Sequence, residues 1–362
     1  MKTKKIHIVL FGIGNVGSTL IDQFQKANQQ IAEQQDIQIE FIAISNSKKI
    51  LLADISREGD WRQTFETSAI TYDLENVLNY VSLTHCDQLI AIDATASTSF
   101  VQHYDRLIQH GFHIISANKI ANTLGFDFYN ALRKTLKENK KLFLYETNVG
   151  AGLPIIDTIR NLHDSGENIT RIRGVFSGSL SYIFNQFSVE DVPFSHILNE
   201  AVEKGYTEPD PREDLSGNDV ARKLLILARE LDLQNEFEDI DIENLIPKDK
   251  REGSKEDFLN SLSDLDTQFQ EAKNQQKEGY VLRYVGDLYG DLFQPKGNLK
   301  VSLVSVPKES SLGSLKGTDA LIEIFTESYG DQPMVIQGAG AGASVTARGV
   351  FGDIMRLAKN HA

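Results

Sequence analysis

The chain has 362 residues, a formal net charge of −14, 41% hydrophobic residues and 24% charged residues. This length favours two domains of about 150 residues each, and the composition is ordinary for a globular protein. The negative charge argues against a basic surface for nucleic acid or for an anionic membrane, and no apolar run reaches the roughly 18 residues of a membrane span. The single cysteine, Cys86, cannot form an internal disulfide or a four-thiolate zinc site, so we expect a cytoplasmic protein.

The first part of the chain alternates strand and helix patterns. Strand patterns cover residues 5–14, 37–45, 87–95, 112–118 and 141–147, and helix patterns cover residues 15–34, 97–111 and 126–140. Strands separated by helices of this length predict βαβ units, a parallel sheet and right-handed connections. We therefore predict an α/β fold with a doubly wound parallel sheet in residues 1–150.

The pattern changes near Gly150, where longer irregular stretches begin. Residues 279–290 and 298–307 predict strands of a second sheet, and the acidic segment from Glu230 to Asp266 is interpreted as a solvated surface with helices. The end of the chain is glycine-rich and then helical. We expect an α+β domain over residues 151–330 and a C-terminal segment over residues 331–362.

The hexapeptide GIGNVG lies directly after the first predicted strand and at the start of a predicted helix. Its first glycine permits a tight turn, its second lets the backbone approach a pyrophosphate, and its third lets helix and strand pack closely. The helix N-terminus adds N–H donors for the phosphates. We predict a Rossmann-type dinucleotide site that contains Gly12, Ile13, Gly14, Asn15, Val16 and Gly17.

The acidic residue expected at the end of the second strand is absent, and Ser45, Asn46, Ser47, Lys48 and Lys49 stand there instead. An acid at this point binds a ribose 2′-OH and repels a 2′-phosphate. Its absence leaves room for NADP, while NAD stays open. For the two lysines, an ordinary solvated loop is the alternative.

Thr95 and Lys119 follow two further predicted strands. Ligands of doubly wound sheets bind at the carboxyl ends of the strands, so a lysine at this edge favours a functional role.

The loop ETNVGAGLP offers few side-chain ligands and many backbone carbonyls. Carbonyl oxygens suit a hard cation such as sodium or calcium. On composition alone, a plain strand–helix turn is the favoured interpretation.

The segment GYTEPDPREDLSGNDVARK gathers acidic residues ahead of one lysine, Lys223. Ser216 and Asp219 fit a variant capping box, which predicts a helix that begins at Gly217. Asp219 lies one turn before Lys223 on the same face. The physics leaves two interpretations equal: a surface ion pair, or a lysine held at a pocket beside an acidic loop that recognises an amino group.

Six motifs together resemble the homoserine dehydrogenase family: GIGNVG, SANK, ETNVGAGLP, FSGSLSYIFN, GYTEPDPREDLSGNDVARK and GAGAGASVTARGVFGDI. The resemblance implies a Rossmann-type domain, a catalytic and dimerisation domain, and a C-terminal helix that returns to the first domain. It implies reversible hydride transfer between NAD(P)H and L-aspartate 4-semialdehyde, giving L-homoserine for threonine, methionine and isoleucine biosynthesis. It also implies a homodimer, and in these 362 residues we expect no aspartokinase and no ACT domain.

The resemblance assigns roles to individual residues. Lys223 is expected to donate the proton with Asp219 as its partner, and Lys119 to lie between cofactor and substrate. The remaining assignments are Glu208, Asp214 and Ser179 for substrate, Gly205 and Gly342 for cofactor, and Glu146, Val149, Ala151 and Leu153 for sodium, mainly through carbonyls. Thr95 is expected at the cofactor from its place at a strand end. Ser179 departs from the threonine that the family often has, but keeps the hydroxyl.

Two other interpretations remain open. Another NAD(P)-dependent dehydrogenase of amino-acid metabolism would turn over a different amino acid. A nucleotide-sensing or scaffolding protein would bind the cofactor without turnover, although the joint presence of Lys119, Asp219 and Lys223 argues against it.

Overall fold

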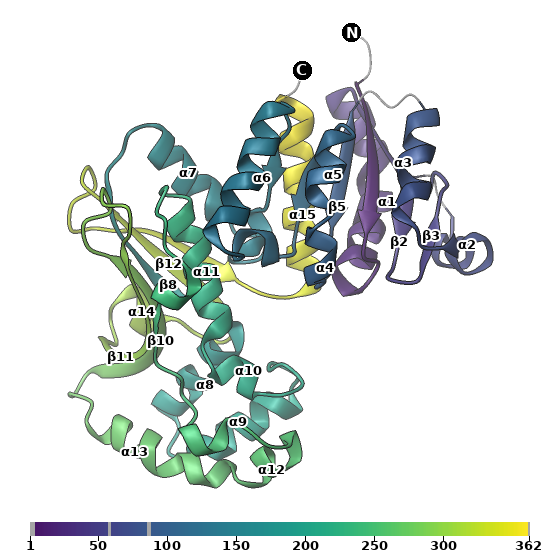
Figure 1. Cartoon of the computed structure of the whole chain (residues 1–362). Helices are drawn as coiled ribbons and strands as arrows, with labels where there is room; N and C mark the ends of the chain where they lie inside the picture. The colour runs from purple at the N-terminus through teal and green to yellow at the C-terminus, as the bar shows by residue number, and fades with distance from the viewer. Residues whose placement is uncertain (1–3, 57–58, 85–87, 361–362) are drawn as a thin grey trace. The chain divides into compact units, whose positions relative to one another are not determined.

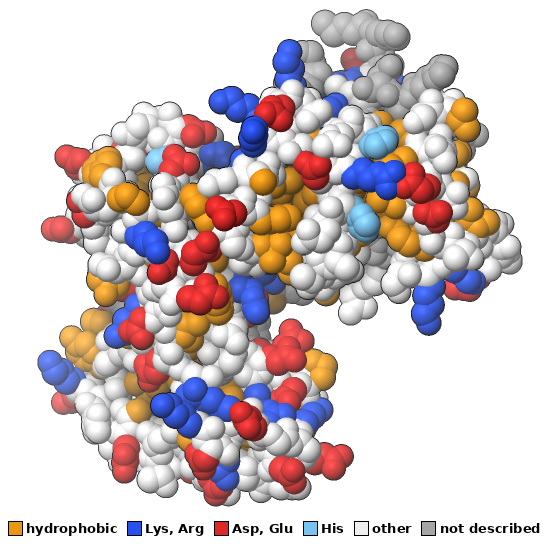
Figure 2. All heavy atoms as spheres, viewed as in Figure 1, with side chains coloured by type: hydrophobic (Ala, Val, Ile, Leu, Met, Phe, Trp, Pro, Cys, Tyr) orange, Lys and Arg blue, Asp and Glu red, His pale blue; other side chains and the backbone are white. Residues whose placement is uncertain are grey.

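The computed structural model describes residues 4–56, 59–84 and 88–360, so the expectation about Cys86 lies outside the described residues. The chain divides into two compact units. The first contains residues 1–148 and 342–362, and the second contains residues 149–341. On the face drawn in Figure 2, acidic and basic side chains are interspersed.

The first unit is built on a seven-stranded sheet with the order β4-β3-β2-β1-β5-β6-β7. Its strands are β1 (Lys4–Phe11), β2 (Ile37–Ser45), β3 (Lys49–Leu51), β4 (Ile70–Thr71), β5 (Leu89–Asp93), β6 (Phe112–Ser116) and β7 (Phe143–Leu144). The five strands β2, β1, β5, β6 and β7 are mutually parallel, and β3 and β4 extend the sheet in antiparallel pairs. The predicted α/β class with a Rossmann-like sheet is confirmed.

Helices cover the sheet, and all but the last of them lie between its strands in the chain (Figure 1). They are α1 (Asn15–Gln35), α2 (Trp61–Ser68), α3 (Leu74–Leu83), α4 (Thr98–Val101), α5 (Tyr104–Gln109), α6 (Phe126–Glu138) and the C-terminal α15 (Ala343–Asn360). The single helix predicted over residues 97–111 is divided in two, because the helical hydrogen bonds are interrupted near Gln102 and His103. The central strands are continuous apolar runs because both faces of the parallel sheet are covered. In β1, for example, Ile8 to Phe11 are at most 1% exposed.

The C-terminal helix α15, drawn in yellow in Figure 1, belongs to the first unit and packs against α1. Val350, Ile354 and Leu357 are fully buried in the same apolar core as Ile8 of β1. Met334–Ala339 form β13 of the other unit, so the returning segment begins at Gly342 and not at residue 331.

The second unit is built on a six-stranded sheet with the order β13-β12-β8-β10-β11-β9. Its strands are β8 (Ile169–Val175), β9 (Asp241–Ile242), β10 (Tyr280–Tyr289), β11 (Asn298–Pro307), β12 (Asp319–Thr326) and β13 (Met334–Ala339). All pairs are antiparallel except β9 with β11. The two strands predicted over residues 279–290 and 298–307 are β10 and β11.

The helices of the second unit are α7 (Ile156–Asp164), α8 (Gly178–Val189), α9 (Phe194–Glu203), α10 (Arg212–Leu215), α11 (Asn218–Arg229), α12 (Lys255–Asn260), α13 (Asp266–Asn274) and α14 (Ser311–Ser314). Both α8 and α11 pack on β10. The acidic segment 230–266 forms short helical pieces, among them α12, with Phe258 and Leu262 buried beneath them. In the described part of the chain, no helix combines the length and apolarity needed to cross a bilayer.

Candidate active site

The glycine motif forms the predicted turn between β1 and α1. Gly12 has φ of 97°, a conformation that L side chains rarely adopt. A Cβ on Gly17 would lie 1.9 Å from the carbonyl oxygen of Gly12, so only glycine permits this close approach of helix and turn. The first turn of α1 directs its backbone N–H groups to this loop, which is the arrangement that binds a pyrophosphate.

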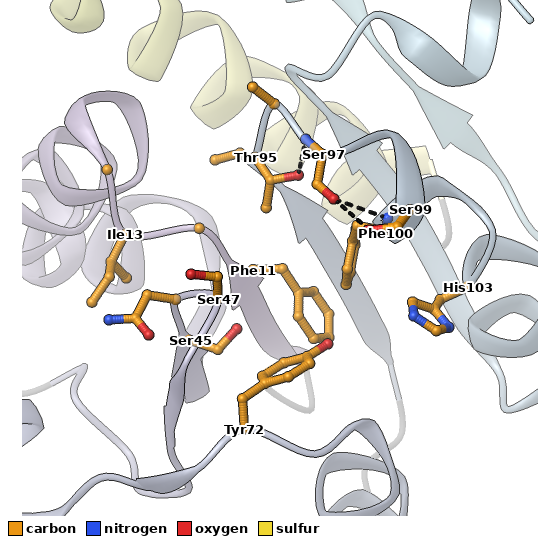
Figure 3. Close-up of a pocket in the computed structure, with 15 residues that line it drawn as sticks. Phe11, Ile13, Ser45, Ser47, Tyr72, Thr95, Ser97, Ser99, Phe100 and His103 are labelled. Atoms are coloured by element: carbon orange, nitrogen blue, oxygen red, sulfur yellow. Dashed lines mark hydrogen bonds between the residues drawn. The ribbon is translucent and has the colours of Figure 1, made fainter.

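A pocket of about 610 Å³ opens beside the motif (Figure 3). It is lined by Gly12, Ile13 and Gly14, by Ser45, Asn46 and Ser47 after β2, and by Ala94 to Ser97 after β5. Of the predicted cofactor residues, Gly12, Ile13, Gly14 and Thr95 line it, whereas Asn15, Val16, Gly17 and Lys119 do not. The pocket lies at the carboxyl ends of parallel strands, as expected for a doubly wound sheet.

Sequence reasoning missed the aromatic wall of this pocket. Tyr72 lines the same cavity as Phe100 and His103, which come from a segment about 30 residues further along the chain (Figure 3). No local motif marks them, because only the order of the strands brings these segments together. Burial raises the pKa of Tyr72 to about 12, so its hydroxyl stays protonated at neutral pH.

The two lysines after β2 differ in their surroundings. Lys49 forms an ion pair with Glu66 at 3.6 Å, whereas Lys48 is exposed. The side chain of Asn46 accepts hydrogen bonds from the backbone N–H groups of Lys48 and Lys49, both at 2.8 Å, and so shapes the turn. The positive charge available at this loop is therefore mainly that of Lys48.

Thr95 and Lys119 follow β5 and β6 as predicted. The backbone N–H of Thr95 donates to a carboxylate oxygen of Asp93 at 2.8 Å. Lys119 is half-buried and directly precedes a 3-10 turn, Ile120–Asn122. Both residues thus stand on short, tightly bonded loops.

In the second unit, the acidic segment lines a pocket of about 340 Å³ that contains Glu208, Asp214 and Asp219. The hydroxyl of Ser179 donates to Asp214 Oδ1 at 2.6 Å, and the backbone N–H of Glu208 donates to Asp214 Oδ2 at 2.8 Å. Burial raises the pKa of Asp214, partly opposed by these hydrogen bonds, and the charge of Asp219 adds to the rise. Such a pocket favours a cationic ligand group. Arg222 also lines it and was missed.

Lys223 is 8% exposed, and its environment excludes the ordinary surface ion pair. Its ammonium donates to the carbonyl oxygen of Phe176 at 2.7 Å and lies 2.7 Å from Asp219 Oδ2. Asp219 remains 46% exposed at its side chain. A buried ammonium beside a half-exposed carboxylate can give a proton to a group bound there.

The predicted capping box is wrong. Helix α11 begins at Asn218, and its N-cap residue is Gly217, which has a left-handed φ of 76° and no side chain to cap the helix. The Ser216 hydroxyl donates to the carbonyl of Glu213 at 2.8 Å and accepts from the N–H of Asn218 at 3.3 Å, not from that of Asp219 as a capping box requires. A Cβ on Gly217 would lie 2.1 Å from the Tyr284 hydroxyl, so tertiary packing decides where this helix starts.

Two glycines expected at the cofactor occupy turns. Gly205 follows the C-cap of α9 with φ of 69° in the second unit, and Gly342 precedes α15 with φ of 112° in the first. Neither lines the pocket beside the glycine motif.

The predicted cation loop has an unusual backbone. Gly150 and Ala151 both have positive φ, 74° and 54°. Val149 is fully buried, and the carbonyl of Leu153 accepts from the N–H of Ile155 at 2.9 Å. Glu146 is 5% exposed and lies 3.5 Å from Arg356. Backbone carbonyls and a carboxylate are oxygen donors of the kind that sodium binds, and among the described residues no group of three acidic, histidine or cysteine side chains forms a metal site.

Two family models match the chain. The one described as "Homoserine dehydrogenase, NAD binding domain" covers residues 12–146, and the one described as "Homoserine dehydrogenase" covers residues 154–355.

The chain is also similar to bifunctional aspartokinase/homoserine dehydrogenases. It is 40% identical to that of Buchnera aphidicola, over 98% of this chain and 43% of the relative. It is 38% identical to the chloroplastic bifunctional enzyme 1 of Arabidopsis thaliana, over 96% of this chain and 38% of the relative. The chain thus spans less than half the length of these relatives.

Solved structures share the fold. A Candida auris protein of unknown function has a TM-score of 0.87 and 31% identity, with 99% of both chains covered. A putative homoserine dehydrogenase from Archaeoglobus fulgidus has a TM-score of 0.75 and 24% identity, covering 97% of this chain and 99% of that one. Since the two family models together cover most of its length, the chain belongs to the homoserine dehydrogenase family.

Proposed function

We propose that the protein is a homoserine dehydrogenase that reversibly reduces L-aspartate 4-semialdehyde to L-homoserine with NAD(P)H. Both family models, the glycine turn with its pocket, and the acidic pocket beside Lys223 support this proposal. The buried Lys223 ammonium, held by Asp219 and a backbone carbonyl, is the observation that carries it.

The charges of the second unit match those of the substrate. Homoserine and its aldehyde are zwitterionic amino acids, so their ammonium requires carboxylates such as Glu208 and Asp214. Ser179 orients Asp214 through its hydrogen bond of 2.6 Å. When bound, the nicotinamide dinucleotide supplies the hydride for the aldehyde carbon. Lys223 then stabilises the negative charge on the aldehyde oxygen and gives it a proton, and Asp219 keeps the lysine in place.

In the first unit, the residues that line the 610 Å³ pocket would hold the dinucleotide. The turn at Gly12 and the start of α1 would bind the pyrophosphate, and the loop at Ser45–Ser47 the adenosine ribose. Without an acid in this loop, and with Lys48 exposed beside it, NADP is expected to be accepted as well as NAD. A hyperthermophilic archaeal homoserine dehydrogenase of the same fold was solved with NADPH, at 22% identity and a TM-score of 0.71. We also propose roles in cofactor binding for Lys119, Gly205 and Gly342.

Three further parts of the proposal rest on the resemblance and on chemistry. Sodium would be held by Glu146 and the carbonyls of Val149, Ala151 and Leu153, where it would stabilise a loop with two positive φ angles. The active form would be a homodimer. The protein would be cytoplasmic, because a single cysteine fits a reducing compartment.

One assay tests the function against its alternatives. Purified protein is mixed with L-homoserine and NADP or NAD, and nicotinamide reduction is followed by absorbance. Homoserine-dependent reduction is expected. Turnover of another amino acid instead would favour a different dehydrogenase, and cofactor binding without any turnover would favour a sensor or scaffold.

A further inference from the structure

A buried carboxylate lies beneath the two loops that carry Thr95 and Lys119. Asp93 ends β5 and is 1% exposed. Its Oδ1 accepts from the Thr95 N–H at 2.8 Å, and its Oδ2 accepts from the Tyr104 hydroxyl at 2.7 Å and from Asn118 Nδ2 at 3.0 Å. Burial raises the pKa of Asp93, and these hydrogen bonds oppose the rise.

Asn118 connects this carboxylate to both loops. It is 4% exposed, and its Nδ2 donates to the carbonyl of Ser97 at 3.1 Å as well as to Asp93. Its Oδ1 accepts from the N–H of Ile120 at 3.1 Å. One amide side chain therefore joins the loop after β5 to the backbone on the far side of Lys119.

The other end of the Lys119 loop is also anchored. Asn122 donates its Nδ2 to Asn148 Oδ1 at 2.9 Å, and Asn148 Nδ2 donates to the carbonyl of Ser116 at 2.8 Å. Both asparagines are at most 1% exposed. The backbone from Ser116 to Asn122 is thus held by buried side chains at both ends, with Lys119 between them.

This network is not explained by stability. In the described part of the chain, Asp93 forms no ion pair, so its carboxylate is a buried charge satisfied by hydrogen bonds alone. Such a group is unfavourable relative to a well-packed apolar residue. A fully bonded buried network instead gives a single rigid arrangement. The rigid parts here include the backbone of Thr95 and Ser97, which line the pocket in Figure 3.

We propose that Asp93, through Asn118, is a positioning residue that places Lys119 and the Thr95–Ser97 loop for hydride transfer. The proposal rests on the function proposed above. It assigns Asp93 no contact with substrate or cofactor and no part in proton transfer.

Asp93→Asn tests the proposal. All three partners of Asp93 are donors, so the NH₂ group that replaces one carboxylate oxygen must face either the Thr95 N–H or the Asn118 NH₂. In either orientation, one of the bonds that hold the two loops is lost. With wild-type homoserine oxidation as reference, kcat should fall at least about tenfold, a larger change than the rise in the Kd of NADPH, measured by its fluorescence. Tyr104→Phe is the matched control: it removes the bonds of this hydroxyl to the same Asp93 oxygen and to the Ser116 hydroxyl, whereas the Asn118 side chain keeps its bonds to Asp93, Ser97 and Ile120. It should stay within about threefold of wild type in kcat.

One combination separates positioning from general damage. In a Lys119→Ala background, Asp93→Asn should cause little further loss, because groups that act through one another are not additive. Full additivity with Lys119→Ala would overturn the proposal.

Thermal melts show whether each variant is folded. If Asp93→Asn is unfolded, Asn118→Ala carries the same test, because it cuts the link and leaves Asp93 bonded to Thr95 and Tyr104. A folded variant with wild-type kcat would also overturn the proposal. Wild-type protein that does not oxidise homoserine would instead overturn the proposed function, and with it this role of Asp93.

Discussion

At the scale of single residues, substitutions of Lys223 distinguish a catalytic role of this lysine from a purely structural one. Lys223→Ala should lower kcat about 10²-fold or more, the usual size of a general-acid contribution, and should hardly change cofactor affinity. Lys223→Arg should not restore activity, because a guanidinium with a pKa above about 12 is a poor proton donor. The measurement is steady-state homoserine oxidation, with thermal melts to confirm folding.

The partner of Lys223 supplies the control. Asp219→Ala should also slow turnover, and the double variant should lose less than the sum of the two single effects, since the ion pair of 2.7 Å acts as a unit. A folded Lys223→Ala protein within threefold of wild-type kcat would contradict the assignment.

Protonation of Asp214 predicts how enzyme activity is lost at acidic pH. Its pKa is raised chiefly by burial, so the folded protein takes up this proton at a higher pH than the unfolded chain does. Protonation of Asp214 therefore favours the folded state as pH falls, and activity should be lost while the protein stays folded. We expect kcat/KM for homoserine to fall as the pH drops below the pKa of Asp214, which lies above the ordinary aspartate value of about 3.9. The affinity for NADPH should be unchanged. An Asp214→Asn variant that keeps the same acid limb would disprove the link.

Ser45 tests the basis of cofactor choice. Ser45→Asp would place a carboxylate at the pocket wall beside Asn46 and Ser47. The KM of NADP should rise about tenfold or more relative to that of NAD, because the new charge repels a 2′-phosphate. Ser45→Asn, similar in size and uncharged, should not cause this shift. If wild-type protein turns over NAD alone, the interpretation of the loop is wrong.

At the scale of elements, the start of α11 depends on a glycine and not on a capping side chain. Gly217→Ala combines a left-handed φ of 76° with a Cβ 2.1 Å from the Tyr284 hydroxyl, which itself donates to the carbonyl of Glu243 at 2.6 Å. We expect a loss of about 2 kcal/mol or more in unfolding free energy. Gly166→Ala is the matched control, with φ of 81° and open space around its Cβ. Equal losses in the two variants would show that backbone strain alone is responsible.

At the scale of the whole molecule, the first unit needs a helix from the other end of the chain. Ile354 of α15 is fully buried in the core that also contains Ile8 and Phe24. Ile354→Ala should therefore cost about 2–5 kcal/mol, measured by urea unfolding of the whole protein. Lys359→Ala, on the exposed side of the same helix, should change stability by less than about 0.5 kcal/mol. Similar stabilities for the two variants would mean that α15 adds little to this core.

The sequence by itself determined the features that depend on neighbours in the chain. The glycine turn after β1, the apolar parallel strands and the bunching of Glu208, Asp214 and Asp219 ahead of Lys223 are local patterns, because turn geometry and side-chain periodicity act over a few residues. Only the tertiary structure decided the rest. The aromatic wall of Tyr72 and Phe100, the carbonyl partner of Lys223 and the link from Asp93 to Asn118 join distant segments through strand order. The predicted cap at Ser216 failed for the same reason: the packing of Gly217 against Tyr284, 67 residues later, outweighs a local hydrogen bond.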